Sequence, residues 1–180
     1  MIYQEKMSKE DRNYQNNAIN AFEKYFYDDE NDRGIISMCC GSGKTYTTFL
    51  IIKKCILEHK ENFFIIETSR VLLIQQLFVD MMMWFKTHKI DISIRTIGGE
   101  GEFDTTNLEK NNMSKKEADK CIREAQISTS NDIQNAIKNK SKPLLIISTY
   151  NSGKKIVDAI DGDKLLYPNL IVLDECHNTT

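Results

Sequence analysis

Short apolar runs alternate along this chain with longer segments in which apolar residues recur at helical spacing. The short runs predict buried strands near residues 35–38, 63–67, 92–97, 144–148 and 170–173. The periodic segments predict helices over residues 12–27, 44–59, 71–86, 115–125, 132–138 and 152–160. Mostly apolar strands that alternate with helices are typical of a parallel sheet covered by helices on both faces. The pattern therefore predicts an α/β fold.

Composition narrows the class of protein without naming a function. The chain has 180 residues, of which 41% are hydrophobic, and this suits one globular domain. A formal net charge of −2 gives no overall basic signal, so nucleic-acid binding would need a local patch. No run approaches the ~18 apolar residues of a membrane span, and the five cysteines lack zinc-ligand spacing. We expect a soluble, intracellular protein with reduced thiols and no membrane partner.

A glycine-rich loop follows the first apolar run and opens a helix. It consists of Gly41, Ser42, Gly43, Lys44 and Thr45. Glycines let backbone N–H groups turn toward phosphate oxygens, and the helix N-terminus adds a positive dipole end. The lysine can reach the β- and γ-phosphates, and the threonine hydroxyl can bind Mg²⁺. The strict phosphate-loop pattern has Gly where this chain has Met38, and a chance glycine turn is the alternative interpretation.

Two acids, Asp174 and Glu175, come directly after the apolar run 170–173. Ligands of open α/β sheets bind at the carboxyl ends of the strands, where these acids are expected. Asp174 can hold Mg²⁺ through water, and Glu175 can orient and deprotonate an attacking water. A strand ending in solvated acids is the alternative for this pair taken alone. With the phosphate loop upstream, the pair predicts a nucleotide-hydrolysing site that contains Lys44, Thr45, Asp174 and Glu175.

The letters DECH at residues 174–177 and MCCGSGKT at residues 38–45 resemble motifs II and I of superfamily 2 helicases. They are most similar to the DEAD-like group that includes restriction-enzyme motor subunits and UvrB-type helicases. In that group the loop often begins with Met and has Cys before the first Gly, so Met38 and Cys40 fit. The resemblance implies a RecA-like P-loop NTPase domain, ATP and Mg²⁺ as cofactors, and Cys40 in the nucleotide-binding loop. It also implies that His177 couples hydrolysis to strand contact.

Further segments resemble motifs that contact the ligands. Arg12 and Gln15 resemble the adenine-recognising segment R-x-Y-Q-x-x-A, although an ordinary amphipathic helix is the alternative. Three other segments resemble those with which the family grips a nucleic-acid backbone, and their candidate residues are Ser69, Arg70, Gly98, Gly99, Ser148 and Thr149. Ser69 is also a candidate N-cap of the following helix. The resemblance favours DNA over RNA as the partner.

The resemblance also sets expectations about what the chain lacks. The family continues with motif III and a second RecA-like domain, so residues 1–180 are expected to form an incomplete first domain, truncated after motif II. The missing domain would supply arginine fingers, whose loss costs related NTPases on the order of 10³–10⁵ in rate. The strand of motif III would lie between strands 35–38 and 170–173, which are therefore expected to share no ladder. Residues 100–126, which are charged, are expected to form an exposed insertion.

Three functions remain open at this point. The first is an ATP-driven helicase or translocase that acts on nucleic acid. The second is the motor of a restriction or DNA-packaging enzyme, which would share the ATPase core and carry a nuclease elsewhere. The third is a nucleotide-binding module that is inert by itself. Strand-stimulated ATP hydrolysis would separate the first from the third, and a nuclease motif would identify the second.

Overall fold

The computed structural model describes residues 13–98 and 114–174, which fall into two compact units divided after Glu58. The first unit contains the α-helices α1 (Asn13–Glu23) and α2 (Lys44–Leu57) and a π-helical turn η1 (Lys24–Asp28) that continues α1. The second unit contains the sheet and the remaining helices. Each unit has its own set of contacts and is described separately.

Side-chain contacts join α1 and η1 to α2 within the first unit. Lys54 forms ion pairs with Glu23 at 3.0 Å and with Glu58 at 2.9 Å, so one ammonium group connects the two helices. The Tyr27 hydroxyl donates to the Cys55 sulfur at 3.4 Å. These contacts fix α2 along α1, and the loop that precedes α2 is therefore held beside the start of α1.

The second unit is built on a four-stranded parallel sheet with the order β2-β3-β1-β4. Its strands are β1 (Phe63–Thr68), β2 (Ser93–Ile97), β3 (Leu144–Thr149) and β4 (Leu170–Leu173). Every residue of β3 is buried, and β1 is buried except at Glu67. Burial on both faces explains why these strands are almost wholly apolar in sequence. Four of the five predicted strands are thereby confirmed within one or two residues.

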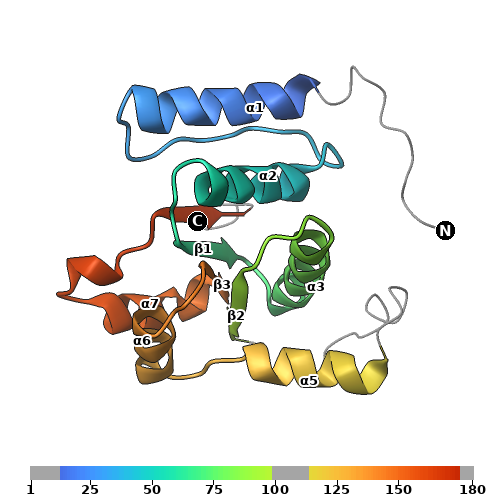
Figure 1. Ribbon diagram of the computed structural model, residues 1–180, viewed down its shortest axis with the longest axis vertical. Helices are drawn as coiled ribbons and strands as arrows, with labels where there is room; N and C mark the ends of the chain where they lie inside the picture. Colours follow the sequence, from blue (N-terminus) through green and yellow to red (C-terminus); the bar gives the residue numbers. More distant parts are fainter. Residues whose placement is uncertain (1–12, 99–113, 175–180) are drawn as a thin grey trace. The chain divides into compact units, whose positions relative to one another are not determined.

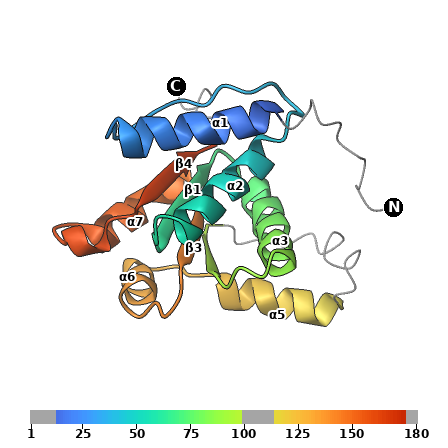
Figure 2. The same ribbon diagram turned by 45° about the horizontal axis from the view of Figure 1, so that its top comes forward.

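Helices cover both faces of this sheet (Figure 1). α3 (Val71–Thr87) lies on one side, and α6 (Ser130–Lys138) and α7 (Gly153–Ile160) lie on the other, as the turned view in Figure 2 also shows. Two short 3₁₀ turns, η2 (Tyr150–Ser152) and η3 (Lys164–Leu166), flank α7. The core on the α6 and α7 side consists of Phe63, Ile65, Ile97, Ile133, Ile137, Leu144, Ile146, Ile156, Ala159 and Leu166. The predicted α/β fold with a parallel sheet is confirmed.

The predicted strand at residues 35–38 does not form. Within the part of the chain that the structure describes, these residues are irregular and belong to no ladder, and the side chain of Ile35 is 89% exposed. An isolated strand has no partner for its backbone N–H and C=O groups, so an apolar run alone does not make one. Residues 35–38 accordingly share no ladder with residues 170–173, but the reason expected, an intervening strand of motif III, stays a prediction.

The helix α5 (Lys115–Ala125) has the bounds expected from the sequence, and its C-terminal part contacts β2. Ile122 and Ala125 are buried, and Arg95 of β2 donates to the Glu124 carbonyl. Ile127 N–H then donates to the Thr96 carbonyl at 2.9 Å, which extends pairing along the outer edge of β2. The helix therefore contacts β2 through a few residues near its end, while Lys120, Arg123 and Glu124 are exposed. The expected exposed insertion at residues 100–126 stays a prediction, since residues 100–113 lie outside the described residues.

Candidate nucleotide and nucleic-acid sites

The glycine-rich loop adopts the conformation that its glycines permit. Gly41 has φ +76° and Gly43 has φ +84°, both in the left-handed region that other residues rarely enter. Between them, Ser42 closes a turn, since its backbone N–H and its hydroxyl both donate to the Cys39 carbonyl, at 3.2 and 2.6 Å. Only glycine adopts these two backbone conformations without strain, which explains why glycine occupies positions 41 and 43.

The helix α2 begins directly after this loop, at Lys44, with Gly43 as its N-cap. The first intrahelical bond runs from the Thr47 N–H to the Gly43 carbonyl at 2.9 Å. The N–H groups of Lys44, Thr45 and Tyr46 precede that bond, and N–H groups at this position point out of the helix end. Together with the helix dipole they form a local environment that favours anions. The Lys44 and Thr45 side chains, both half-buried, start from the same turn.

Two residues of α1 contact the loop at one atom. The Tyr14 hydroxyl and the Gln15 side-chain amide both donate to the Ser42 carbonyl, the latter at 3.4 Å. Gln15 is 2% exposed, and a Cβ placed on Gly43 would lie 2.6 Å from its Nε2 atom. The segment that resembles the adenine-recognising motif and the glycine-rich loop are thus in direct contact inside the first unit. Arg12 lies outside the described residues.

The acid Asp174 follows β4 in the second unit, and both of its backbone polar groups are hydrogen-bonded. Its backbone N–H donates to the Glu67 carbonyl at 2.9 Å, and its carbonyl accepts from the Tyr150 hydroxyl. Glu175 and His177 lie outside the described residues. Because Asp174 and the phosphate loop belong to different units, their convergence with Glu175 on one cleft stays a prediction.

Polar groups gather where β1, β2 and β3 end. The Ser148 hydroxyl donates to Glu67 Oε1 at 3.3 Å, and that oxygen would lie 2.6 Å from a Cβ on Gly153, at the start of α7. Burial raises the pKa of Glu67, and the hydrogen bond from Ser148 opposes the rise. The sequence pattern did not single out Glu67, because the partners that define its role lie 81 residues away in the chain.

The same edge brings Gly98 beside the turn that follows β3. The Thr149 hydroxyl donates to Ser152 Oγ at 3.0 Å, and a Cβ on Gly98 would lie 2.9 Å from that oxygen. Ser148 is completely buried and Thr149 nearly so, and both hydroxyls are bonded within the protein. Phosphate contact through either hydroxyl stays a prediction, and Gly99 lies outside the described residues.

The start of α3 is the most open part of this edge. Arg70 is exposed and extended, and it occupies the N-cap position without a side-chain cap. Ser69 is half-buried and does not cap the helix, so that alternative is not supported. Thr68 is fully buried, and its hydroxyl has no hydrogen-bond partner among the described residues. The helix end and the arginine together provide donors that a phosphate group could accept from.

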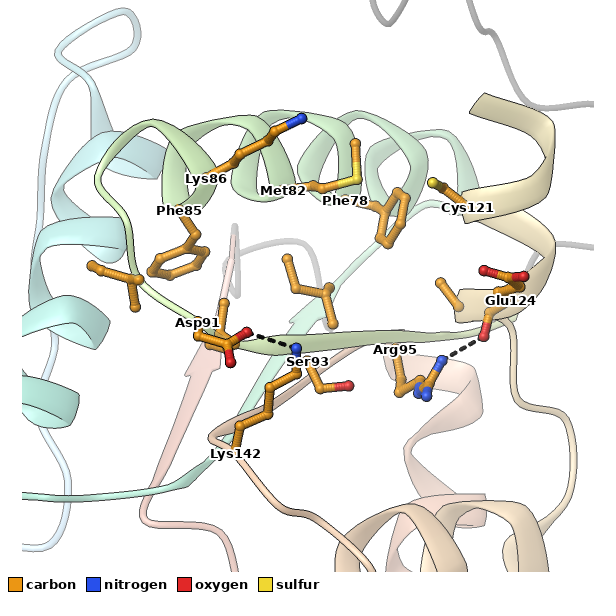
Figure 3. Close-up of a pocket in the computed structure, with 14 residues that line it drawn as sticks. Phe78, Met82, Phe85, Lys86, Asp91, Ser93, Arg95, Cys121, Glu124 and Lys142 are labelled. Carbon is orange, nitrogen blue, oxygen red and sulfur yellow. Dashed lines mark hydrogen bonds and ion pairs between the residues drawn. The ribbon is translucent and has the colours of Figure 1, made fainter. Parts of the chain in front are cut away.

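A separate groove of about 450 Å³ lies between α3, α5 and β2 (Figure 3). Phe78 and Phe85 form part of its apolar wall, and Lys86 lies at its rim. Lys142 and Asp91, which both line the groove, form an ion pair at 2.7 Å. None of the motif residues lines this groove, so it is distinct from both candidate sites.

Comparisons with known proteins identify a family and a shared fold. The family model described as "Type III restriction enzyme, res subunit" matches residues 8–180. No curated protein sequence matches the chain. Among solved structures, a nuclease-deletion mutant of the Type ISP restriction-modification enzyme LlaGI, in complex with a DNA substrate mimic, is similar with a TM-score of 0.62 at 22% identity. That similarity covers 92% of this chain and 15% of the LlaGI chain.

A second solved structure shows the same fold. The ATP-dependent Type ISP restriction-modification enzyme LlaBIII, bound to DNA, is similar with a TM-score of 0.57 at 21% identity, over 82% of this chain and 9% of that chain. The present chain therefore spans only a small part of these relatives. From its match over residues 8–180, the chain belongs to the family of Type III restriction enzyme res subunits, and its fold is the RecA-like α/β fold found in the two restriction enzymes.

Proposed function

We propose that this chain binds ATP with Mg²⁺ and is the first RecA-like domain of a DNA-dependent motor of the restriction-enzyme kind. The observation that supports this most is the loop at Gly41 and Gly43, whose left-handed conformations open the N-terminus of a 14-residue helix. That arrangement fits phosphate groups, because backbone N–H donors, a helix dipole and Lys44 start from the same turn.

Residues of the glycine-rich loop would hold ATP. Gly41, Ser42, Gly43 and Lys44 would contact its phosphates, with Cys40 and Arg12 beside them, and Gln15 would pair with the adenine edge. Thr45 and Asp174 would hold Mg²⁺, which usually keeps several waters and takes only one or two protein ligands beside the phosphates. Glu175 would accept the proton of the attacking water, and His177 would link that step to DNA contact.

DNA would lie along the carboxyl edge of the sheet in the second unit. Arg70 and the first turn of α3 would contact the backbone phosphates, with Ser69, Gly98, Gly99 and Thr149 close to the same strand. Ser148 would act indirectly, because its hydroxyl donates to Glu67. Such contacts recognise the sugar-phosphate backbone and not the base sequence. The relatives in complex with DNA favour DNA over RNA as the ligand.

Two substitutions test the assignment of the ATP site. Lys44→Ala removes a positive charge from the phosphates and is expected to weaken Mg²⁺-ATP binding by tenfold or more, on the order of 1.4 kcal/mol per tenfold. Glu175→Gln removes only the carboxylate that would accept the proton of the attacking water, so ATP binding persists while any ATP hydrolysis stops. Isothermal titration with ATP, followed by a phosphate-release assay with and without single-stranded DNA, measures both effects.

The outcomes separate the three candidate functions. Equal loss of binding in the two variants would contradict the assigned roles. Binding without hydrolysis, at any DNA concentration, would favour a nucleotide-binding module that is inert by itself. Hydrolysis that rises with DNA would support a motor. The family match favours the restriction-enzyme motor over a general helicase, and a nuclease motif elsewhere in the full-length protein would test that choice.

A further inference from the structure

The outer edge of β2 has backbone groups that point away from the sheet. β2 is the outermost strand of the described sheet beside β3, and the Ser93 N–H donates to the Pro143 carbonyl at 2.8 Å. Because successive residues of a strand direct their N–H and C=O groups to alternate sides, those of Ile94 point outward. Thr96 also points outward, and its carbonyl accepts from the Ile127 N–H at 2.9 Å. Within the described part of the chain, this edge is therefore paired at Thr96 and open at Ile94.

The groove between α3, α5 and β2 lies along this open edge and has two different sides (Figure 3). Phe78, Met82 and Phe85 come from α3 and form an apolar side. Arg95 lies on the opposite face of β2, because it shares the alternation of Ile97, which belongs to the core on the α6 and α7 side. A strand added at this edge would therefore meet apolar side chains on one face and a cation on the other.

Ion pairs already compensate most of the charges that line the groove. Lys142 forms an ion pair with Asp91 at 2.7 Å. The Glu124 carboxylate forms one with Lys120 at 3.7 Å. Arg95 is half-buried, and it donates to the backbone carbonyl of Glu124, which carries no net charge. A guanidinium group has five N–H donors, so Arg95 retains donors and a positive charge for a ligand carboxylate.

We propose that this edge binds an extended segment of a partner protein, in which apolar side chains alternate with an acidic one. The segment adds a strand beside Ile94 and continues the pairing that begins at Thr96. Its apolar side chains lie against Phe78 and Phe85, and its carboxylate binds Arg95. The groove volume of about 450 Å³ lies in the range of ~300–1,000 Å³ typical of ligand pockets. This site is separate from the proposed ATP and DNA sites, since none of their residues lines the groove.

Short synthetic peptides test the charge and the alternation of the ligand separately. The probe is Gly-Val-Glu-Val-Gly with an N-terminal fluorescein and a C-terminal amide, and its fluorescence anisotropy is measured as the 180-residue chain is added. Gly-Val-Gln-Val-Gly removes the charge, and Gly-Val-Val-Glu-Gly keeps the composition but breaks the alternation. Both control peptides are expected to bind at least about tenfold more weakly, because a charge-assisted hydrogen bond is lost or misplaced. Equal affinity of the three peptides, or no saturable binding of the probe, overturns the proposal.

Methylation of single peptide nitrogens tests the strand pairing itself. In a strand added to β2, only every second residue directs its N–H toward the edge. N-methylation of the glutamate and N-methylation of the following valine therefore give different results. One of them should weaken binding by at least about tenfold, and the other should change it by less than about threefold. If both peptides, or neither, lose affinity, the ligand does not add a strand and the proposal is wrong.

Arg95→Gln tests the anchor for the carboxylate. This variant should bind the glutamate peptide at least about tenfold more weakly, whereas its affinity for the glutamine peptide should stay within about twofold of that of the unchanged chain. An equal loss for both peptides would indicate a structural effect and would refute the role of Arg95. Arg123→Gln is the matched control, because Arg123 is an exposed arginine of α5 that does not line the groove. It should retain the affinity for both peptides.

Alkylation of Cys121 covers the case in which Arg95→Gln fails to fold, because it uses the unchanged chain. Cys121 is a free thiol that lines the groove, whereas Cys39 is an exposed thiol of the other unit. The glutamate peptide at saturation should slow alkylation of Cys121 several-fold and leave that of Cys39 unchanged. Unchanged alkylation of Cys121 would show that the peptide binds elsewhere. A dimer detected by light scattering, in which Cys121 is already protected and which the peptide does not dissociate, would identify a second copy as the occupant and overturn the proposal.

Discussion

Replacing Gly43 by alanine should disturb the phosphate loop through the buried amide of Gln15. The residue has φ +84°, and forcing alanine into this region costs roughly 1–2 kcal/mol. Its new Cβ would also lie 2.6 Å from the Gln15 Nε2 atom, closer than any real contact of this kind. Gln15 is a flexible side chain, but it is 2% exposed, so its amide has no solvent into which it can turn.

The cost of displacing the Gln15 amide can be separated from the cost of backbone strain at Gly43. If the Gln15 amide gives up its bond to the Ser42 carbonyl and stays buried, the loss is about 1–3 kcal/mol. Gly41 offers the matched control, since it has φ +76° and no atom lies within 4 Å of its added Cβ. Gly41→Ala should therefore show only the backbone strain of about 1–2 kcal/mol, whereas Gly43→Ala should show roughly 2–5 kcal/mol in total.

A double-mutant cycle with Gln15→Ala measures the contact directly. Free energies of unfolding come from urea titrations followed by circular dichroism, with the slope of each transition checked for change. In the Gln15→Ala background, Gly43→Ala should cost no more than Gly41→Ala does. The reasoning is refuted if the coupling energy between positions 15 and 43 is below about 0.5 kcal/mol, the usual limit for independent sites, or if the two glycine variants are equally destabilised.

Three further outcomes follow from the described contacts. Ile122→Ala in α5 should lower the free energy of unfolding by about 2–4 kcal/mol, because Ile122 is buried, whereas Lys120→Ala on the exposed side of the same helix should change it by less than about 0.5 kcal/mol; equal melting temperatures would mean that α5 does not pack. Mg²⁺-ATP should slow alkylation of Cys39 and Cys40, which are exposed beside the phosphate loop, and should not affect Cys121 in the other unit; quantitative mass spectrometry checks this, and equal protection of all three would contradict a site at the loop. Burial raises the pKa of Glu67 above its usual 4.5, so the folded chain holds this proton more tightly and loses stability as the pH rises from about 4.5 through the raised pKa. Glu67→Gln should remove that part of the pH dependence. If the free energy of unfolding, measured by urea titrations between pH 4 and 8, changes with pH in Glu67→Gln as it does in the unchanged chain, Glu67 is not the cause.

The sequence predicted the four strands that pair in the sheet and mispredicted the one that lacks a neighbour. The apolar run 63–68 pairs with β3 and β4 and was recognised from its composition alone. The run at 35–38 has a similar composition, but no ladder includes it among the described residues, and Ile35 is exposed. An apolar run indicates that a segment could be buried, but it does not indicate whether a partner strand is present.

Long-range hydrogen bonds explain the rest of what sequence reasoning missed. The segment with Tyr14 and Gln15 resembled a base-recognising motif, yet spacing alone did not show that both donate to Ser42. Tyr150 and Glu67 were visible only as members of longer motifs, since their partners are distant in the chain. The helix α5 was predicted at residues 115–125, and the capping box formed by Ser114 and Glu117 is a local signal that agrees with it.

The position of β1 inside the sheet has a consequence for how the chain is made. Its partner on β3 comes much later, since Glu67 and Ser148 are 81 residues apart, and the Phe63 N–H reaches Asn169 over a separation of 106 residues. At a synthesis rate of about 5–20 residues per second, β1 leaves the ribosome roughly 4–16 s before β3 can pair with it. During that interval the apolar segment Phe63–Thr68 has neither neighbour and can associate with other nascent chains. Slower synthesis lengthens this exposure, so the yield of folded chain should depend on chaperones that shield the segment until residue 149 has emerged.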